Sequence, residues 1–256
     1  MFRVALWIIA VFAAWAVPVG SSFAAHPLLT EDTGTQGTGN SQLELTYDSF
    51  RDRLAGTKVR GAQSAALYSY GVIETADLQI GLPYLRLDED EPGGRRRLTS
   101  GINDLSIDVK WRFFERGAFS LALKPGITLP TGDADKFLGA GRVTWGALLV
   151  GSYEPGALAF HSHVGYRDFD NTIGAKVSLW HVSAAATWQV VERLKLVMDL
   201  SRDSNPVPGY YRPLVYVIGG AIWTPVKNLD LDIGYRYGAS KPALDQGLLA
   251  GVTLRW

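Results

Sequence analysis

Asp245-Gln-Gly-Leu-Leu-Ala-Gly-Val-Thr-Leu-Arg-Trp256 is the stretch that decides the fold. From Leu248 every second residue is apolar up to Trp256, and the residues between them, such as Thr253, are polar or glycine. This period of two predicts a β-strand with one apolar and one polar face. A last strand left unpaired would invite aggregation, so we expect it to pair with the first strand as well as with its predecessor. Such pairing predicts a closed antiparallel β-barrel.

Eleven earlier segments also predict strands, most of them with the same alternation; residues 62–72 alternate weakly, and residues 214–223 are apolar on both faces. In the clearest of them Leu105, Ile107 and Val109 face one way, while Asp108 and Lys110 face the other. The segments are residues 42–48, 62–72, 75–84, 104–113, 119–129, 142–153, 158–167, 180–188, 194–200, 214–223 and 229–237. With the closing segment they predict about twelve strands, an even number typical of transmembrane barrels of the outer membrane.

The connections between these segments alternate in length. Tight connections lie at residues 73–74, 114–117, 154–156, 191–193 and 224–228. Longer and more polar ones lie at residues 51–60, 86–101, 130–141 and 202–212. Short periplasmic turns alternating with longer extracellular loops are the arrangement of outer-membrane barrels.

Aromatic residues mark the two edges of the apolar band. Trp180 and Trp188 share one side of a strand, and at about 3.3 Å per residue and a tilt of roughly 40° they lie about 20 Å apart along the membrane normal. That separation is close to the roughly 25 Å apolar band of these barrels. The residues expected in the aromatic girdles are Trp111, Trp180, Trp188, Tyr235 and Trp256.

The beginning of the chain predicts export. Arg3 is the only charge before an apolar run, which is followed by small residues up to Ala25. We predict a cleaved signal peptide at residues 1–24, with an uncleaved membrane anchor as the alternative. Residues 25–41 are polar, glycine-rich and without period, which predicts a flexible periplasmic leader before a barrel at residues 42–256.

Composition excludes several classes of site. The chain has no cysteine, so disulfides and thiolate chemistry are unavailable to it. It carries 25 basic and 25 acidic side chains, a balance that gives no reason to expect a nucleic-acid partner. No apolar run after the signal approaches the roughly 20 residues that a membrane helix needs.

Alternation alone does not say which face points outward. A soluble barrel or sandwich with an apolar core is therefore the rival fold. Twelve strands enclose more interior than side chains readily fill, since about eight strands already give a filled or single-ligand interior. A barrel with its apolar side chains in lipid and its charges in the lumen has no unfilled apolar cavity, so we expect that arrangement.

Two stretches carry a resemblance to a known family. The leader His26-Pro-Leu-Leu-Thr-Glu-Asp-Thr-Gly-Thr-Gln-Gly37 and the segment Lys124-Pro-Gly-Ile-Thr-Leu-Pro-Thr-Gly-Asp133, together with the strand pattern, resemble the family named for the meta-pathway of phenol degradation. The resemblance covers nearly the whole chain after the signal. It implies an outer-membrane barrel with a transport role, and the family name implies uptake of aromatic compounds.

The polar faces of the strands supply the candidate site. Asp108 and Lys124 lie at matching distances from the turn at residues 114–117, so we expect them to face each other. The charges either line a polar path or pair with one another to fill the lumen, as buried charges must. The lumen-lining candidates are Asp104, Asp108, Lys110, Arg112, Lys124, Arg142, His161, His163, Arg167, Asp199, Asp230, Asp232, Arg236 and Arg255.

Catalytic and metal sites are weaker hypotheses. His161, His163 and His181 could converge, but no carboxylate stands at a diagnostic metal-ligand spacing, so no metal or cofactor is predicted. Ser162 lies on the face opposite to the two flanking histidines, so it forms no Ser–His pair with them. A lipid-modifying enzyme would need such a pair, and we expect no enzymatic activity.

Expected partners follow from the membrane location. Arg95, Arg96 and Arg97 either pair with the preceding acids in a solvated loop or contact phosphates of lipopolysaccharide. The C-terminal strand predicts recognition by the barrel-assembly machinery. The favoured function is a passive channel for small, aromatic or hydrophobic molecules, and a structural or ligand-binding barrel with a closed lumen is the alternative.

Overall fold

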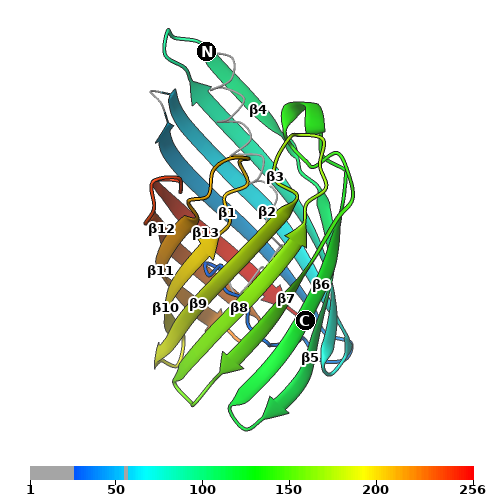
Figure 1. The fold of residues 1–256 in the computed structure, drawn as a ribbon. Coiled ribbons are helices and arrows are strands. Elements are labelled where there is room, and N and C mark those ends of the chain that lie inside the picture. Colours follow the sequence, from blue (N-terminus) through cyan, green and yellow to red (C-terminus); the bar gives the residue numbers. More distant parts are fainter. Residues whose placement is uncertain (1–25, 55–56) are drawn as a thin grey trace.

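The computed structural model describes residues 26–54 and 57–256, so the predicted signal peptide lies outside the described residues. The described chain is a barrel of strongly tilted strands (Figure 1). One short 3-10 helix, η1 (Ala134–Lys136), lies in a loop. The strands are β1 (Ser41–Leu54), β2 (Thr57–Ile73), β3 (Ala76–Asp90), β4 (Arg96–Ile102), β5 (Leu105–Arg116), β6 (Phe119–Leu129), β7 (Thr144–Tyr153), β8 (Leu158–Asp168), β9 (Ser178–Val191), β10 (Leu194–Asp203), β11 (Leu214–Val226), β12 (Leu229–Gly238) and β13 (Gln246–Arg255).

The barrel closes as the sequence predicts. The first strand, β1, pairs antiparallel with both β2 and the last strand, β13. β3 pairs with β5 through its first half and with β4 through its second half. Since only Asn103 and Asp104 separate β4 from β5, the two act as one interrupted strand. The fold is therefore a closed twelve-stranded antiparallel barrel, which confirms the predicted class.

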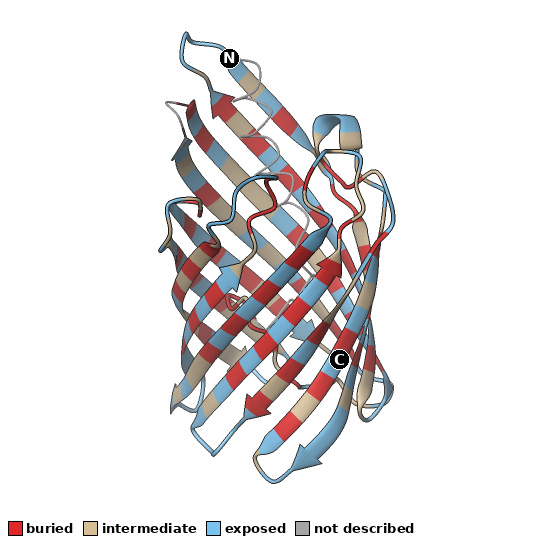
Figure 2. Cartoon of the chain, viewed as in Figure 1, coloured by how far each residue is buried: buried red, intermediate tan, exposed pale blue. Residues whose placement is uncertain are grey.

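The apolar faces point outward along the whole wall. On β7, Trp145, Leu149 and Tyr153 are exposed, whereas Leu148 and Ser152 between them face inward and are buried. Figure 2 shows the same alternation of buried and exposed residues on strand after strand. The outward side chains would be left in water by a soluble barrel, and Ile233, for example, is 63% exposed. This outer band fits lipid, so the rival soluble fold is wrong.

No helix among residues 26–54 and 57–256 is both long and apolar enough to cross a membrane.

On the extracellular side, two of the predicted loops are instead extensions of strands. Residues 51–60 and 86–101 were expected to be loops, but they are largely the ends of tall hairpins, β1–β2 and β3–β4 (Figure 1). The alternation continues there because inward residues of these strands, Phe50, Val59 and Leu85, pack inside the barrel. Polar residues take the outward positions beyond the membrane band, and this weakens the apolar signal in the sequence.

An apolar layer closes the extracellular end of the lumen. It contains Phe50, Val59, Leu85, Leu87, Leu138, Leu214, Tyr216, Ala243 and Leu244. Leu138 and Leu244 come from the β6–β7 and β12–β13 connections, which fold inward. Asp104, between β4 and β5, accepts backbone N–H bonds from Gly132 at 3.0 Å and Ala140 at 2.7 Å, so it holds the first of these loops inside.

Closure of the wall predicts a heat-modifiable barrel. Ser41 and Trp256 exchange two backbone hydrogen bonds, of 2.8 and 3.0 Å, which extend the β1–β13 ladder to the end of the chain. A barrel without free edges resists detergent at room temperature. On a denaturing gel the unboiled protein is expected to migrate faster than the boiled protein. Identical migration of the two samples would contradict the closed barrel.

Candidate functional site: the lumen and the segment that crosses it

Most of residues 26–36 lies inside the barrel, and the chain reaches the exposed residues 38–40 before β1 begins. The sequence predicts a flexible leader at residues 25–41, but the structure places His26, Thr30, Glu31 and Thr33 among its buried residues. The segment follows the inner wall past β3, β6, β7, β8 and β10 to β12 and β1. We name residues 26–36 the plug segment.

Side chains of the wall satisfy the backbone of the plug segment. Asp199 on β10 accepts the N–H groups of Leu29 at 3.0 Å and Thr30 at 2.7 Å. Farther along the segment, the N–H groups of residues 31, 33 and 36 donate to His163, Ser152 and Asp77, respectively, at 2.9 to 3.1 Å. A buried irregular chain must find partners for its N–H groups, and here the barrel supplies them. The plug segment is thus fixed without belonging to any sheet.

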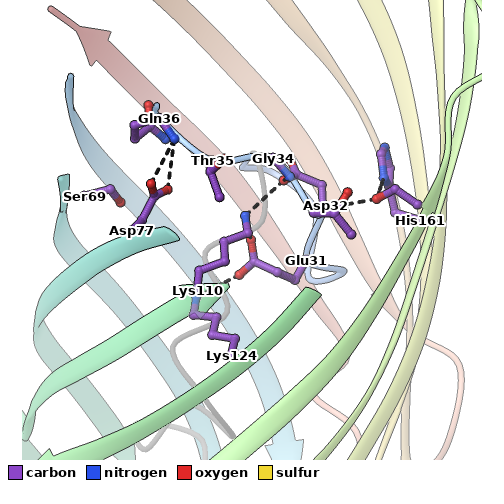
Figure 3. A network of polar contacts seen from close by, with 12 residues as sticks. Glu31, Asp32, Gly34, Thr35, Gln36, Ser69, Asp77, Lys110, Lys124 and His161 are labelled. Atoms are coloured by element: carbon purple, nitrogen blue, oxygen red, sulfur yellow. Dashed lines mark hydrogen bonds and ion pairs between the residues drawn. The ribbon is translucent and has the colours of Figure 1, made fainter. Parts of the chain in front are cut away.

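Glu31 is the electrostatic centre of the lumen (Figure 3). Its carboxylate oxygens accept bonds from Lys110 Nζ and Lys124 Nζ, both at 2.8 Å. Asp32 also binds Lys110, at 3.0 Å, and this contact with the lysine charge outweighs the effect of burial and lowers the pKa of Asp32 to about 2. Glu31 and both lysines are buried, so each charge depends on these partners.

His26 anchors the other end of the plug segment. Its ring nitrogens bond to Asp232 on β12 and to Asp48 on β1, the second at 3.0 Å. Burial alone would lower the pKa of His26, but the hydrogen bonds and charges of the two carboxylates outweigh it and raise the pKa to about 9. The imidazole is therefore charged at neutral pH and neutralises part of the acidic wall.

The structure places most of the predicted lumen residues on the inner wall. Buried there are Asp104, Asp108, Lys110, Lys124, His161, His163, Arg167, Asp199, Asp232 and Arg236. Arg112, Asp230 and Arg255 are partly exposed toward the end with the short turns. Arg142 lies elsewhere: β7 begins at Thr144, and the Arg142 side chain is 55% exposed and pairs with Asp170 across two extracellular loops.

The predicted pairing of Asp108 with Lys124 is wrong in register. Asp108 lies opposite Gly126, because the strands turn at residues 117–118 and the ladder shifts between Arg112 and Phe114. The Asp108 carboxylate occupies the space beside Gly126: a Cβ there would stand 1.9 Å from Asp108 Oδ1, so a larger residue would force the carboxylate to move. Lys124 points instead to Glu31, which the sequence did not identify as a partner because the leader shows no period.

The histidines do not assemble a metal site. His163 and His181 lie ring against ring, with centroids 4.5 Å apart, and His181 Nδ1 binds Asp203. No group of three histidine, aspartate or glutamate side chains suited to a metal ion occurs in the part of the chain that is described.

A Ser–His pair does occur, on residues that the sequence did not single out. Ser162 faces outward as predicted, but Ser152 Oγ on β7 lies 2.9 Å from His161 Nδ1. Glu154 Oε1 approaches the same nitrogen at 4.0 Å. A catalytic triad uses one ring nitrogen for serine and the other for the acid, and this arrangement places both at Nδ1.

A hollow opens at the end with the short turns. It measures about 170 Å³ and is lined by Thr33, Gly34, Arg112, Glu115, Gly117, Ala118, Ser120 and Glu154. The plug segment forms its inner surface, and charged side chains form its rim. The lumen therefore has a polar periplasmic mouth, a plugged middle and an apolar extracellular layer.

Solved structures with a similar fold are outer-membrane barrels. An outer membrane channel from Pseudomonas putida F1 matches with a TM-score of 0.64 at 15% identity, covering 88% of this chain and 98% of that one. The β domain of the Bordetella autotransporter BrkA matches at 0.58 and 13%, covering 85% and 100%. The KdgM porin matches at 0.57 and 8%, covering 83% and 98%. No match was found among curated protein sequences.

The fold and its outer surface set the location. A closed barrel with an apolar outer band and a charged interior belongs in the bacterial outer membrane. The family model described as "Putative MetA-pathway of phenol degradation" matches residues 30–256, which include part of the plug segment and the whole wall. By this match the chain belongs to the MetA-pathway phenol-degradation family of outer-membrane barrels.

Proposed function

We propose that this protein is a passive outer-membrane channel for small molecules and that the plug segment closes it. The observation that carries the proposal is that the middle of the lumen is filled by a segment outside the sheet rather than by the wall itself. A twelve-stranded wall is wide enough to need such filling. Removing the segment leaves a charged path from the periplasmic mouth up to the extracellular apolar layer, whose inward-folded loops are the second barrier.

The contacts of the plug segment suit reversible displacement. Most of them are hydrogen bonds and ion pairs that water can replace when the lumen opens. Its apolar contacts are those of two leucines: Leu28 packs against Ala185, Val197 and Ile222, and Leu29 packs against the extracellular apolar layer. Displacement therefore exposes these two side chains and also breaks the contacts of the charged groups.

Small apolar or aromatic solutes are the proposed cargo. The extracellular layer around Phe50, Leu87 and Tyr216 is apolar and is partly made by loops that could part. A solute that partitions into such a layer passes it more easily than an ion does. The family name points to the same class of compound.

A barrel with a permanently closed lumen is the second candidate. The same plug segment favours it, because the wall supplies partners for several of the segment's N–H groups and charges. Neither candidate requires bond-making chemistry in the lumen, so we propose no enzymatic activity.

A reversible lock separates the two candidates. Thr33 Oγ1 on the plug segment lies 2.5 Å from Ser120 Oγ on β6, and the chain contains no cysteine that could interfere. Oxidised Thr33→Cys/Ser120→Cys is expected to show no single-channel current in planar bilayers. Reduction is expected to restore the current, because the segment can leave again.

A disulfide within the wall provides the matched control. Thr128 Oγ1 and Thr144 Oγ1, on β6 and β7, also lie 2.5 Å apart, but neither belongs to the plug segment. Thr128→Cys/Thr144→Cys is expected to conduct equally in both redox states. Equal conduction by the oxidised and reduced Thr33→Cys/Ser120→Cys lock would exclude the plug as the gate. Silence of all forms would support the closed barrel.

A further inference from the structure

Four basic side chains gather on the outer face of the β1–β2 hairpin, which rises on the extracellular side (Figure 1). They are Arg51 and Arg53 on β1 and Lys58 and Arg60 on β2, and all four are exposed. Their neighbours in sequence, such as Phe50 and Val59, are buried inside the barrel. Alternation therefore fixes all four charges on the membrane side of the wall.

The strand register sets these charges against each other. Arg51 is the direct partner of Arg60, and Arg53 is the direct partner of Lys58. Like charges directly opposite on one face of an antiparallel pair are destabilising. Across β2–β3, Arg60 lies opposite Asp88, but the Asp88 carboxylate is bound by Arg96.

None of the four forms an ion pair with another described residue, although Arg96 and Arg142 each do. The nearby carboxylates of Asp88, Asp52 and Asp245 therefore offset the four charges only in part, without a direct ion pair.

The cluster stands at the outer edge of the lipid band. Near the short turns, the rings of Tyr68 and Trp256 lie 6.3 Å apart and mark the periplasmic interface. From the neighbouring Tyr70 to Arg60 the chain advances about ten residues, which is roughly 25 Å along the normal at about 3.3 Å per residue and a tilt near 40°. Arg60 thus lies about one thickness of the apolar lipid layer away from the periplasmic interface, where the headgroups of the outer leaflet begin.

A hollow of about 350 Å³ accompanies the cluster. All four basic residues line it, together with Val59, Gln246 and two acids, Asp52 and Asp245. Asp52 is on the inward side of β1, and Asp245 precedes β13. The site is therefore a basic hollow with an acidic inner side.

We propose that Arg51, Arg53, Lys58 and Arg60 bind the phosphate groups of lipopolysaccharide in the outer leaflet. Guanidinium groups bind phosphate in bidentate fashion, and a doubly charged phosphate placed between opposed arginines turns their repulsion into attraction. We favour this site over Arg95, Arg96 and Arg97, because Arg96 is bound by Asp88 and Arg97 lies opposite Glu89 on the inward face. The proposal depends on the outer-membrane location and not on conduction.

The test compares lipids on the full mature protein purified free of lipopolysaccharide. Binding of bisphosphorylated lipid A, monophosphoryl lipid A, phosphatidylglycerol and inorganic phosphate is measured by native mass spectrometry in detergent. Arg51→Gln/Arg60→Gln is expected to bind bisphosphorylated lipid A about tenfold or more weakly than wild type, given the strength of charge-assisted hydrogen bonds. Arg116→Gln/Lys227→Gln, two exposed basic residues near the short turns, is expected to bind it like wild type.

Thermal unfolding supplies a second readout. Without lipid, Arg51→Gln/Arg60→Gln is expected to be at least as stable as wild type, because the repulsion is gone. Addition of bisphosphorylated lipid A is expected to raise the unfolding temperature of wild type more than that of the variant. Unchanged lipid A affinity of the variant would overturn the proposal. Equal wild-type affinity for phosphatidylglycerol, or for inorganic phosphate alone, would reassign the site to a general anion and overturn it as well.

Discussion

Replacing Glu31 with glutamine is expected to open the channel by about 100-fold in the ratio of open to closed states. In the closed lumen Glu31 joins Lys110 and Lys124, all three buried. Removing one partner from a buried ion pair costs about 3–5 kcal/mol, and Lys110 keeps Asp32, so the lower end of that range applies. In the open lumen water solvates both lysines, so the cost falls on the closed state. About 1.4 kcal/mol corresponds to a factor of ten.

Single-channel recording in planar bilayers measures this effect as open probability. Glu31→Asp keeps the negative charge, so its open probability is expected to be lower than that of Glu31→Gln. Asp32→Asn is expected to have a smaller effect than Glu31→Gln, because the Asp32 side chain is 32% exposed and Lys110 keeps Glu31. Deletion of residues 26–36 is expected to give the highest open probability of the series. If the deletion variant conducts while Glu31→Gln stays closed, the ion pairs of Glu31 do not hold the plug segment in the lumen. If the deletion is silent too, the lumen is closed by other parts.

Placing an arginine on the middle of the lipid face is expected to destabilise the barrel strongly. Leu149 lies midway between Trp145 and Tyr153 on the outer face of β7 and is 46% exposed. An arginine at the bilayer midplane of such a barrel costs about 2–4 kcal/mol, because its charge must be desolvated or must distort the bilayer. The free energy of unfolding of Leu149→Arg in lipid vesicles is therefore expected to fall by that amount.

Depth provides the control for the Leu149 variant. Tyr153→Arg, four residues further along the same face and near the interface, is expected to cost about 0–1 kcal/mol. Denaturant titration in vesicles, followed by tryptophan fluorescence, measures both variants. Equal losses at the two positions would show that the band on β7 does not follow membrane depth.

Two errors in the sequence interpretation have separate causes. Asp108 and Lys124 were expected to face each other across a turn at residues 114–117, but the strands turn at residues 117–118, and this later turn places Gly126 opposite Asp108. The exact position of a turn leaves no period in the sequence. Residues 51–60 were expected to be a loop because their outward residues are charged, although Phe50 and Val59 already showed that alternation continues.

The sequence by itself determined the closed antiparallel barrel and its strand number, because strand alternation is local: each residue faces the opposite side from its neighbour, whatever the remaining chain does. The strand number then placed the apolar face outward, since twelve strands enclose too wide an interior for an apolar core. Only the tertiary structure decided that residues 26–36 fill the lumen and that Glu31 neutralises two lysines. The reason is that the N–H groups and the carboxylate of this aperiodic segment find their partners on strands as far along the chain as Asp199. No local pattern encodes such contacts.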